Sequence, residues 1–173
     1  MSVQTIVPNL WFDTKGLEAA EWYVEVFSGR IGAESRPKSE IVAVSRYPTD
    51  VFDGAKKAGD VLTVDFQLEG QRFTAINGGP NFTFDEAVSF LVNCESQEEI
   101  DELWDKLGEG GEHGPCGWLK DKYGLSWQIV PSEMDQLMLS GPNEEGRKRA
   151  FAAMMQMGKL DIAELRRAYE SEA

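Results

Sequence analysis

The feature that most constrains the fold is an internal repeat of a strand followed by a helix. A shift of 80 positions places Leu10 on Phe90 and Phe12 on Val92. The same shift superimposes the apolar positions of two helical segments, 16–27 and 97–107. In both segments these positions follow the spacing i, i+3, i+4, i+7 of an amphipathic helix. Because one shift fits strand and helix together, the sequence indicates a duplicated unit.

Each half continues with strands. We expect strands at 5–12, 32–36, 41–46, 61–68 and 71–76 in the first half, and at 87–92, 117–120 and 125–130 in the second. The last strands of the halves match at a shift of 54, since Gly70 falls on Gly124 and Phe73 on Trp127. The polar segment 47–59 lengthens the first half. The sequence therefore predicts two βαβββ modules in tandem.

Helix caps fix further boundaries. Ser96 and Glu99 form a capping box before the second repeated helix. After Pro131 the composition changes, and Asn143 is expected to cap a helix at 144–157. Asp161 is expected to cap another helix at 162–170. These two helices lie outside the repeat and could pack against the sheet or against another subunit.

The predicted fold class is α+β, with the two modules forming a curved mixed sheet around a cavity. Residues 1–131 are expected to be one domain, with modules at 1–80 and 81–131, and residues 132–173 a C-terminal helical extension. A chain of 173 residues is long enough to bury a core in one such domain.

The net charge of −13 argues against a nucleic-acid or anionic-membrane partner, because both require a positive surface. No apolar run is long enough to span a bilayer. The first residues lack the basic and apolar pattern of a secretion signal, so we expect a cytoplasmic protein.

Several segments resemble a known family. They are 8–12, 21–27, 73–80, 88–94 and 116–131. The chain resembles the PhnB-like branch of the glyoxalase, or vicinal oxygen chelate, superfamily, which often carries the label demethylubiquinone methyltransferase. The sequence gives that label no support, because no glycine-rich turn joins a strand to a helix with an acidic residue after it.

The resemblance implies paired modules around a U-shaped cavity, and homodimers that sometimes exchange elements. In the metal-dependent members, it implies a divalent ion held by the first and last strands, usually through His, Glu or Gln. Here the alternation of strand residues places Asn9, Trp11, Ser89, Thr74 and Gln128 on the cavity face. Only Gln128 matches the ligand types of the family.

The metal expectation follows from charge. A divalent ion needs charged oxygens or imidazole to replace its hydration shell, and these positions carry neutral side chains. We therefore predict no metal and no cofactor. The single histidine, His113, lies in a segment that is loop by composition and is expected to be exposed.

Aromatic residues complete the predicted cavity. Trp118 opens a strand near Trp11, and aromatic walls with a few neutral polar groups suit an uncharged organic ligand. The alternative is that the aromatic rings fill the cavity. The predicted ligand contacts are Asn9, Trp11, Thr74, Ser89, Trp118 and Gln128.

Three functions remain open. The first is a metal-independent module that binds a small, largely neutral organic molecule. The second is a glyoxalase-like lyase, isomerase or dioxygenase that uses a divalent metal. The third is a structural homodimer without a ligand, with the apolar C-terminal helices as its interface. The sequence leaves open whether the chain catalyses any reaction.

Overall fold

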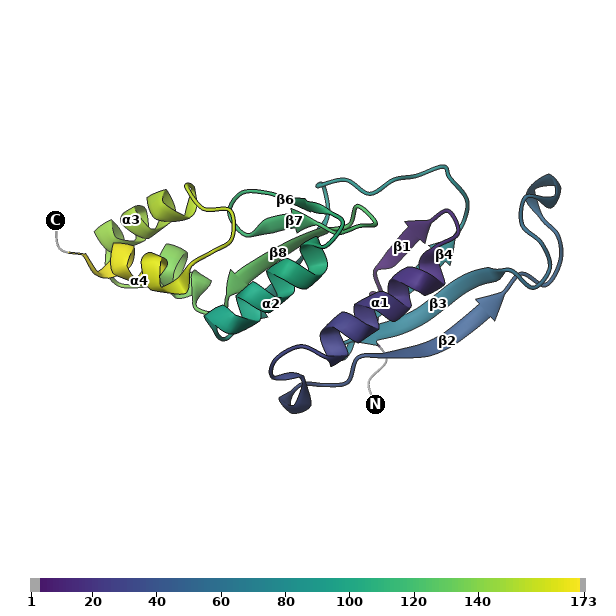
Figure 1. The fold of residues 1–173 in the computed structure, drawn as a ribbon, viewed down its shortest axis with the longest axis horizontal. Helices are drawn as coiled ribbons and strands as arrows, with labels where there is room; N and C mark the ends of the chain where they lie inside the picture. The colour runs from purple at the N-terminus through teal and green to yellow at the C-terminus, as the bar shows by residue number, and fades with distance from the viewer. Residues whose placement is uncertain (1–3, 172–173) are drawn as a thin grey trace. The chain divides into compact units, whose positions relative to one another are not determined.

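The computed structural model describes residues 4–171. The chain forms two compact units, Met1–Phe84 and Asp85–Ala173, and each contains a four-stranded mixed sheet (Figure 1). We call them the first unit and the second unit.

The first unit runs from strand to helix to three further strands. Its elements are β1 (Asn9–Phe12), α1 (Gly16–Ser28), β2 (Glu40–Arg46), β3 (Val61–Leu68) and β4 (Gln71–Asn77), with short 3-10 turns at Ala33–Ser35 and Phe52–Gly54. The strand order is β1-β4-β3-β2, in which β1 is parallel to β4 and the other pairs are antiparallel.

The second unit repeats this plan and then adds helices. Its elements are β5 (Ser89–Cys94), α2 (Gln97–Gly108), β6 (Glu112–His113), β7 (Trp118–Lys120), β8 (Ser126–Pro131), a π turn (Gln136–Ser140), α3 (Glu144–Met154) and α4 (Ile162–Glu170). The order β5-β8-β7-β6 has the same parallel and antiparallel pairs as the first sheet. The predicted tandem βαβββ modules with C-terminal helices are confirmed, and each module has its own sheet.

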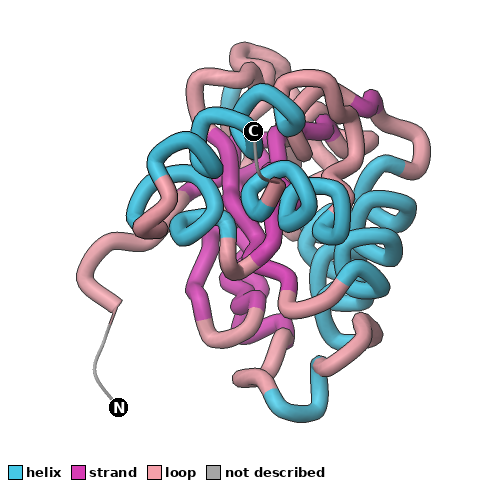
Figure 2. Tube along the Cα trace, turned by 90° about the vertical axis from the view of Figure 1, so that its left-hand side faces the viewer, coloured by secondary structure: helices cyan, strands magenta, loops and turns pink. Residues whose placement is uncertain are grey.

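One helix packs against each sheet, α1 against β2, β3 and β4 and α2 against β5, β7 and β8; Figure 2 shows the helices in cyan and the strands in magenta. In the first unit, the ring of Tyr23 on α1 stacks with that of Phe66, with 6.2 Å between the ring centroids. The rings of Phe66 and Phe73 stack with 5.4 Å between their centroids. In the second, Ile100 and Leu103 of α2 are fully buried. The apolar stripe read from the repeat is therefore the core face of both helices.

The C-terminal helices build a second cluster within the second unit. Val130 of β8 packs with Leu137, Leu160 and Leu165, with methionines around them. Val130 lies two residues after Gln128 on β8, so the extension packs beside the strand that carries a predicted ligand contact. The predicted boundary at residue 131 stays a prediction.

The three predicted helix caps are present. The side chain of Ser96 accepts a hydrogen bond from the Glu99 N–H at 3.3 Å. Asn143 accepts from Gly146 at 2.9 Å, and Asp161 accepts from Glu164 at 2.8 Å. These bonds satisfy donors that the first helical turn leaves unpaired.

Three sequence predictions need correction. Residues 32–36 do not form a strand, since Gly32 has φ 77° and begins the turn at Ala33–Ser35. His113 is exposed as expected, but it lies in strand β6, where it pairs with Leu119 of β7, and not in a loop. The helix expected at 144–157 ends at Met154. The N–H of Met157 donates to the Met154 carbonyl oxygen at 3.0 Å, which forms a turn after the helix.

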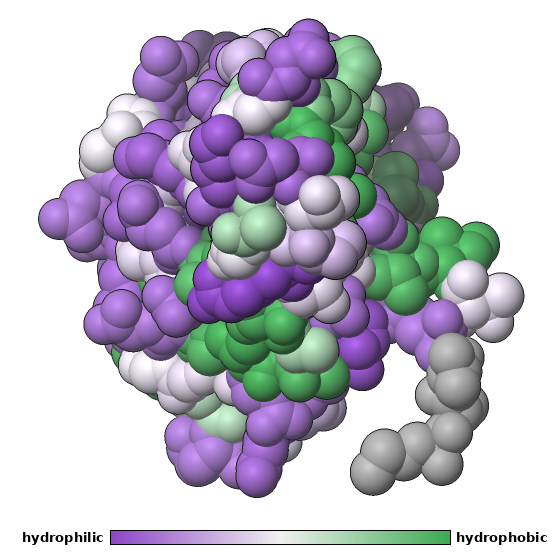
Figure 3. Space-filling model, turned by 90° about the vertical axis from the view of Figure 1, so that its right-hand side faces the viewer, coloured by the Kyte–Doolittle hydropathy of each residue, from purple (hydrophilic) through white to green (hydrophobic). Residues whose placement is uncertain are grey.

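Some large apolar side chains reach the surface, as the green areas among the purple in Figure 3 show for one face of the molecule. Val42 and Val44 are exposed on β2, which is an edge strand of its sheet. Phe151 and Met155, at the end of α3, are about half exposed. No helix within residues 4–171 is long and apolar enough to cross a membrane.

Candidate functional site

The predicted site residues lie on the sheet faces opposite those that α1 and α2 cover, here called the open faces. In β1, Leu10 and Phe12 are buried toward α1, whereas Asn9 and Trp11 alternate with them. Asn9 pairs in register with Thr74 of β4, so these side chains share one face. The structure thus brings together Asn9, Trp11 and Thr74 on the first sheet.

Each of these three side chains already has a partner in its own unit. The Asn9 amide donates to the Val7 carbonyl oxygen at 2.8 Å. The Trp11 indole N–H donates to the Gly79 carbonyl oxygen at 2.8 Å. A side chain at Gly78 would place its Cβ 2.2 Å from the Trp11 ring, so this glycine is what lets the indole lie against the chain. Trp11 is therefore held by its own unit.

Thr74 has a partner that the sequence analysis missed. Its hydroxyl donates to a carboxylate oxygen of Asp65 at 2.6 Å, and Asp65 lies opposite Thr74 on β3. The signal was available in the sequence, because the buried residues Val64 and Phe66 place Asp65 on the open face by alternation.

The second sheet carries the other three predicted contacts. The Gln128 amide donates to the Ser89 hydroxyl at 2.8 Å. Gln128 pairs in register with Leu91 on one side and with Trp118 on the other. Ser89, Trp118 and Gln128 therefore share the open face of the second sheet.

The donor chemistry at these positions does not fit a divalent metal ion. Asn9, Thr74, Ser89 and Gln128 supply neutral oxygens and amides, and Asp65 adds one carboxylate that already accepts the Thr74 hydroxyl. Within residues 4–171, no three His, Cys, Asp or Glu side chains gather closely enough to hold an ion. Hard and borderline divalent ions prefer several charged ligands.

A cavity of about 360 Å³ opens on the second sheet. Of the predicted contacts, only Trp118 lines it. The lining side chains with chemical function are Glu86, Glu112, His113, Cys116, Trp118, Lys120 and Ser126. The sequence analysis missed Ser126 and Lys120, although Ser126 is two residues from Gln128 on the same strand and shares its face.

Three of these residues form a row across neighbouring strands. Glu112 of β6 pairs with Lys120 of β7, and Lys120 pairs with Ser126 of β8. Residues directly opposite in antiparallel strands point to the same face. The register therefore places a carboxylate, an ammonium and a hydroxyl side by side.

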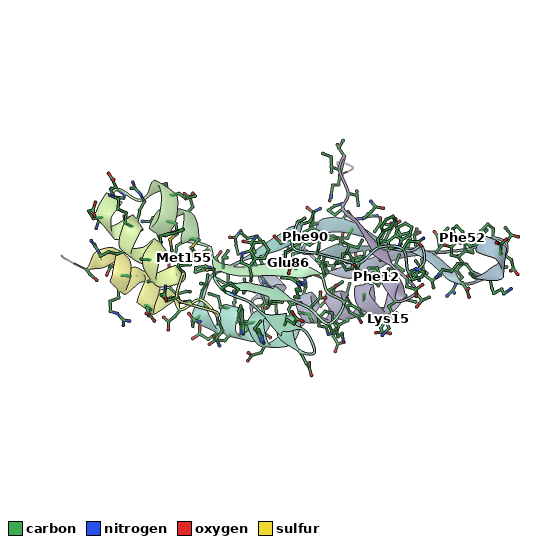
Figure 4. All side chains as sticks on the ribbon, turned by 90° about the horizontal axis from the view of Figure 1, so that it is seen from above. Phe12, Lys15, Phe52, Glu86, Phe90 and Met155 are labelled. Atoms are coloured by element: carbon green, nitrogen blue, oxygen red, sulfur yellow. The ribbon has the colours of Figure 1, made fainter. Side chains whose placement is uncertain are left out.

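Lys120 also reaches a carboxylate from outside the sheet. Its ammonium lies 2.5 Å from an oxygen of Glu86, which precedes β5 and is labelled in Figure 4. The hydrogen bond from Lys120 lowers the pKa of Glu86, and the same bond raises the pKa of Lys120. Both groups are therefore charged near neutral pH, although their exposure to solvent weakens the attraction.

Ser126 differs from every other predicted or observed contact. Its side chain is fully buried and lines the cavity, and its hydroxyl has no hydrogen-bond partner among residues 4–171. An unpaired buried hydroxyl costs about 1–3 kcal/mol, so such groups are rare in folded proteins. A ligand in the cavity would supply the missing partner.

The cavity rim is tied to the C-terminal extension. Cys116 and Gly117 have φ of 56° and 82°, and their N–H groups donate to the carbonyl oxygens of Met157 and Gly158, both at 2.8 Å. The Cys116 sulfur lies 3.8 Å from that of Met155. The segment after α3 therefore fixes the turn that leads into Trp118.

His113 lines the same cavity from its strand but is held by α2. Its ring stacks on Trp104 at 4.7 Å between centroids, and Nε2 lies 3.2 Å from the Trp104 carbonyl oxygen. Both contacts are on the helix side of the sheet, where Leu119 opposite His113 is also buried. The imidazole is thus a packing group, and the open face is left to Lys120 and Ser126.

Comparisons with known proteins cover the repeated part of the chain. Residues 4–130 match the family described as 3-demethylubiquinone-9 3-methyltransferase. A PhnB protein from Bacillus cereus is 37% identical over 75% of this chain and 100% of its own, with a TM-score of 0.60. Protein PA1353 from Pseudomonas aeruginosa is 20% identical over 75% of this chain and 98% of its own, with a TM-score of 0.56. No functionally curated protein is similar enough in sequence to match.

The family match spans both βαβββ modules, and the Bacillus cereus protein shares both the fold and more than a third of its residues with this chain. The chain therefore belongs to the 3-demethylubiquinone-9 3-methyltransferase family and is PhnB-like.

Proposed function

We propose that this protein binds a small organic molecule without a metal ion, in the cavity on the open face of the second sheet. One observation carries the proposal: the buried Ser126 hydroxyl has no partner among the described residues and lines that cavity. The volume of about 360 Å³ lies within the range of small-molecule sites, roughly 300–1,000 Å³.

The remaining chemistry of the cavity supports such a ligand. Trp118 offers a half-buried aromatic surface, and Lys120 and Ser126 offer polar groups close to it. An apolar wall with a few convergent polar groups is the usual composition of an organic ligand site. Gln128, next to Trp118 in register, remains a proposed contact at the edge of the same face.

The first unit contributes less to this proposal. Asn9, Trp11 and Thr74 each donate a side-chain hydrogen bond within their own unit. A ligand would have to replace these bonds, whereas Ser126 has none to lose. We keep the three residues as proposed contacts of the first unit.

A homodimer is also proposed. Exposed apolar residues on the edge strand β2 and at the end of α3 would be covered in such an assembly. The apolar C-terminal helices, the interface considered from the sequence, offer Phe151 and Met155. The cytoplasmic location stays a prediction.

Ser126→Ala is expected to make the protein more stable and less able to bind its ligand. Alanine removes the unpaired hydroxyl, so the free energy of unfolding should rise by about 1 kcal/mol in the absence of ligand. Urea unfolding measures this change. Ser89→Ala is the matched control, because the Ser89 hydroxyl accepts from Gln128 and its loss should lower stability. Equal destabilisation by both substitutions would remove the basis of the proposal.

The binding function is tested on untagged protein with a set of small aromatic compounds. We expect some of them to raise the melting temperature of the natural protein and to lose that effect in Ser126→Ala. Native mass spectrometry and elemental analysis of the same sample test metal independence. One tightly held divalent ion per chain would contradict it and favour the glyoxalase-like enzyme.

A further inference from the structure

The cavity on the second sheet has a defined order of charges. Glu112, Lys120 and Ser126 follow one another across β6, β7 and β8. Neighbouring strands lie about 4.8 Å apart, so each of these side chains is within reach of the next. Trp118 lies two residues from Lys120 on β7, on the same face, and begins the adjacent row.

The net charge of the side chains in and beside this row is negative. Glu86 and Glu112 carry two negative charges against the one positive charge of Lys120, and Lys120 is already paired with Glu86 at 2.5 Å. The carboxylates of Asp85 and Glu112 also attract the Lys120 ammonium group. An incoming anion would have to displace Glu86 and would then face the uncompensated charge of Glu112. A cation would instead be attracted by Glu112, whose carboxylate has no ion-pair partner among the described residues.

The hydroxyl and the indole suit the same kind of ligand. A serine oxygen can accept an N–H of an ammonium group, which would satisfy the buried Ser126. The face of a tryptophan attracts cations and also packs against apolar carbon. A divalent metal ion suits the row poorly, because such ions prefer several charged ligands and no three His, Cys, Asp or Glu side chains within residues 4–171 gather closely enough to hold one.

We infer that the cavity is selective for a small organic cation, namely a primary amine on an aromatic or apolar body. Glu112 is its counter-ion, Ser126 accepts one of its N–H groups, and Trp118 covers its body. The inference rests on the proposed binding function and adds the charge of the ligand to it.

Three probes that share one skeleton test the charge preference: 2-phenylethylamine, 2-phenylethanol and phenylacetate. Binding is followed at neutral pH and low salt by calorimetry and by the indole N–H resonance of Trp118, assigned with Trp118→Phe. We expect the amine to bind about tenfold more tightly than the alcohol, and phenylacetate to bind most weakly. A tenfold difference corresponds to about 1.4 kcal/mol.

Glu112→Gln removes one negative charge from an exposed position and so leaves the core intact. It should weaken binding of the amine about fivefold, the size of a partly exposed ion pair, and leave binding of the alcohol unchanged. Glu98→Gln is the matched control, because Glu98 is an exposed residue of α2, the helix that covers the other face. Its affinities should equal those of the natural protein.

The outcomes separate this inference from the function on which it rests. If the alcohol or phenylacetate binds as tightly as the amine, or if Glu112→Gln leaves the amine affinity unchanged, the charge preference is wrong while the binding function stands. If none of the three probes shifts the Trp118 resonance at millimolar concentration, both the preference and the proposed site are overturned.

Discussion

Replacing Asp121 with alanine is expected to lower the free energy of unfolding of the second unit by about 3–4 kcal/mol. The Asp121 side chain is buried, and one carboxylate oxygen accepts the N–H groups of Tyr123 at 2.8 Å and Leu125 at 3.1 Å. The other oxygen accepts the indole N–H of Trp127 at 2.8 Å. Alanine would leave three donors without this acceptor, and the indole N–H is buried where water cannot replace it.

Urea unfolding followed by near-ultraviolet circular dichroism measures the effect, because Trp127 contributes to the aromatic signal. Asp121→Asn separates the two halves of the contact: its amide oxygen can still accept from the turn, but its NH₂ group would face the indole N–H. The double variant Asp121→Asn with Trp127→Phe removes that opposed donor and should recover part of the stability. A loss below about 1 kcal/mol for Asp121→Ala would contradict the role of the carboxylate.

The repeat was the part of the fold most visible in the sequence. Apolar spacing alone located α1 and α2, because a helix that covers a sheet must present one continuous apolar stripe. Strand β6 escaped notice because a two-residue strand, Glu112–His113, is too short to show alternation and is held by pairing with β7. Residues 32–36 were mistaken for a strand because the turn at Ala33–Ser35 depends on the positive φ of Gly32. No apolar pattern in the sequence reveals that backbone conformation.

The site was predictable only in part, for a related reason. Alternation along each strand says which of its side chains share a face, and in the structure the predicted contacts Ser89 and Gln128 are hydrogen-bonded to each other. It does not say which side chains already have partners. Alternation places Asp65 on the open face, but its bond with Thr74 and the missing partner of Ser126 both depend on register between strands, which a single sequence does not specify.

Replacing Asn77 with alanine is expected to destabilise the first unit by about 2–3 kcal/mol. Helix α1 lacks a side-chain cap of its own at Lys15. Asn77, at the end of β4, supplies one instead: its amide oxygen accepts the Gly16 N–H at 2.8 Å. Its amide nitrogen donates to the carbonyl oxygens of Thr14 at 3.1 Å and Val61 at 3.2 Å. One buried side chain therefore joins the helix start to two strands.

The repeat makes this dependence specific to the first unit. Pro131 occupies the place of Asn77 in the second sheet, since the shift of 54 that matches the last strands places Asn77 on Pro131 and each residue ends its strand. There, α2 is capped locally by Ser96.

Asn77→Asp sharpens the test, because it keeps an acceptor for Gly16 but sets a carboxylate against two carbonyl oxygens, so it should also destabilise. Asn93→Ala, at an exposed position of β5, is the control and should change the free energy of unfolding by less than about 0.5 kcal/mol. If Asn77→Ala behaved like this control in urea unfolding, α1 would not depend on a cap supplied from β4.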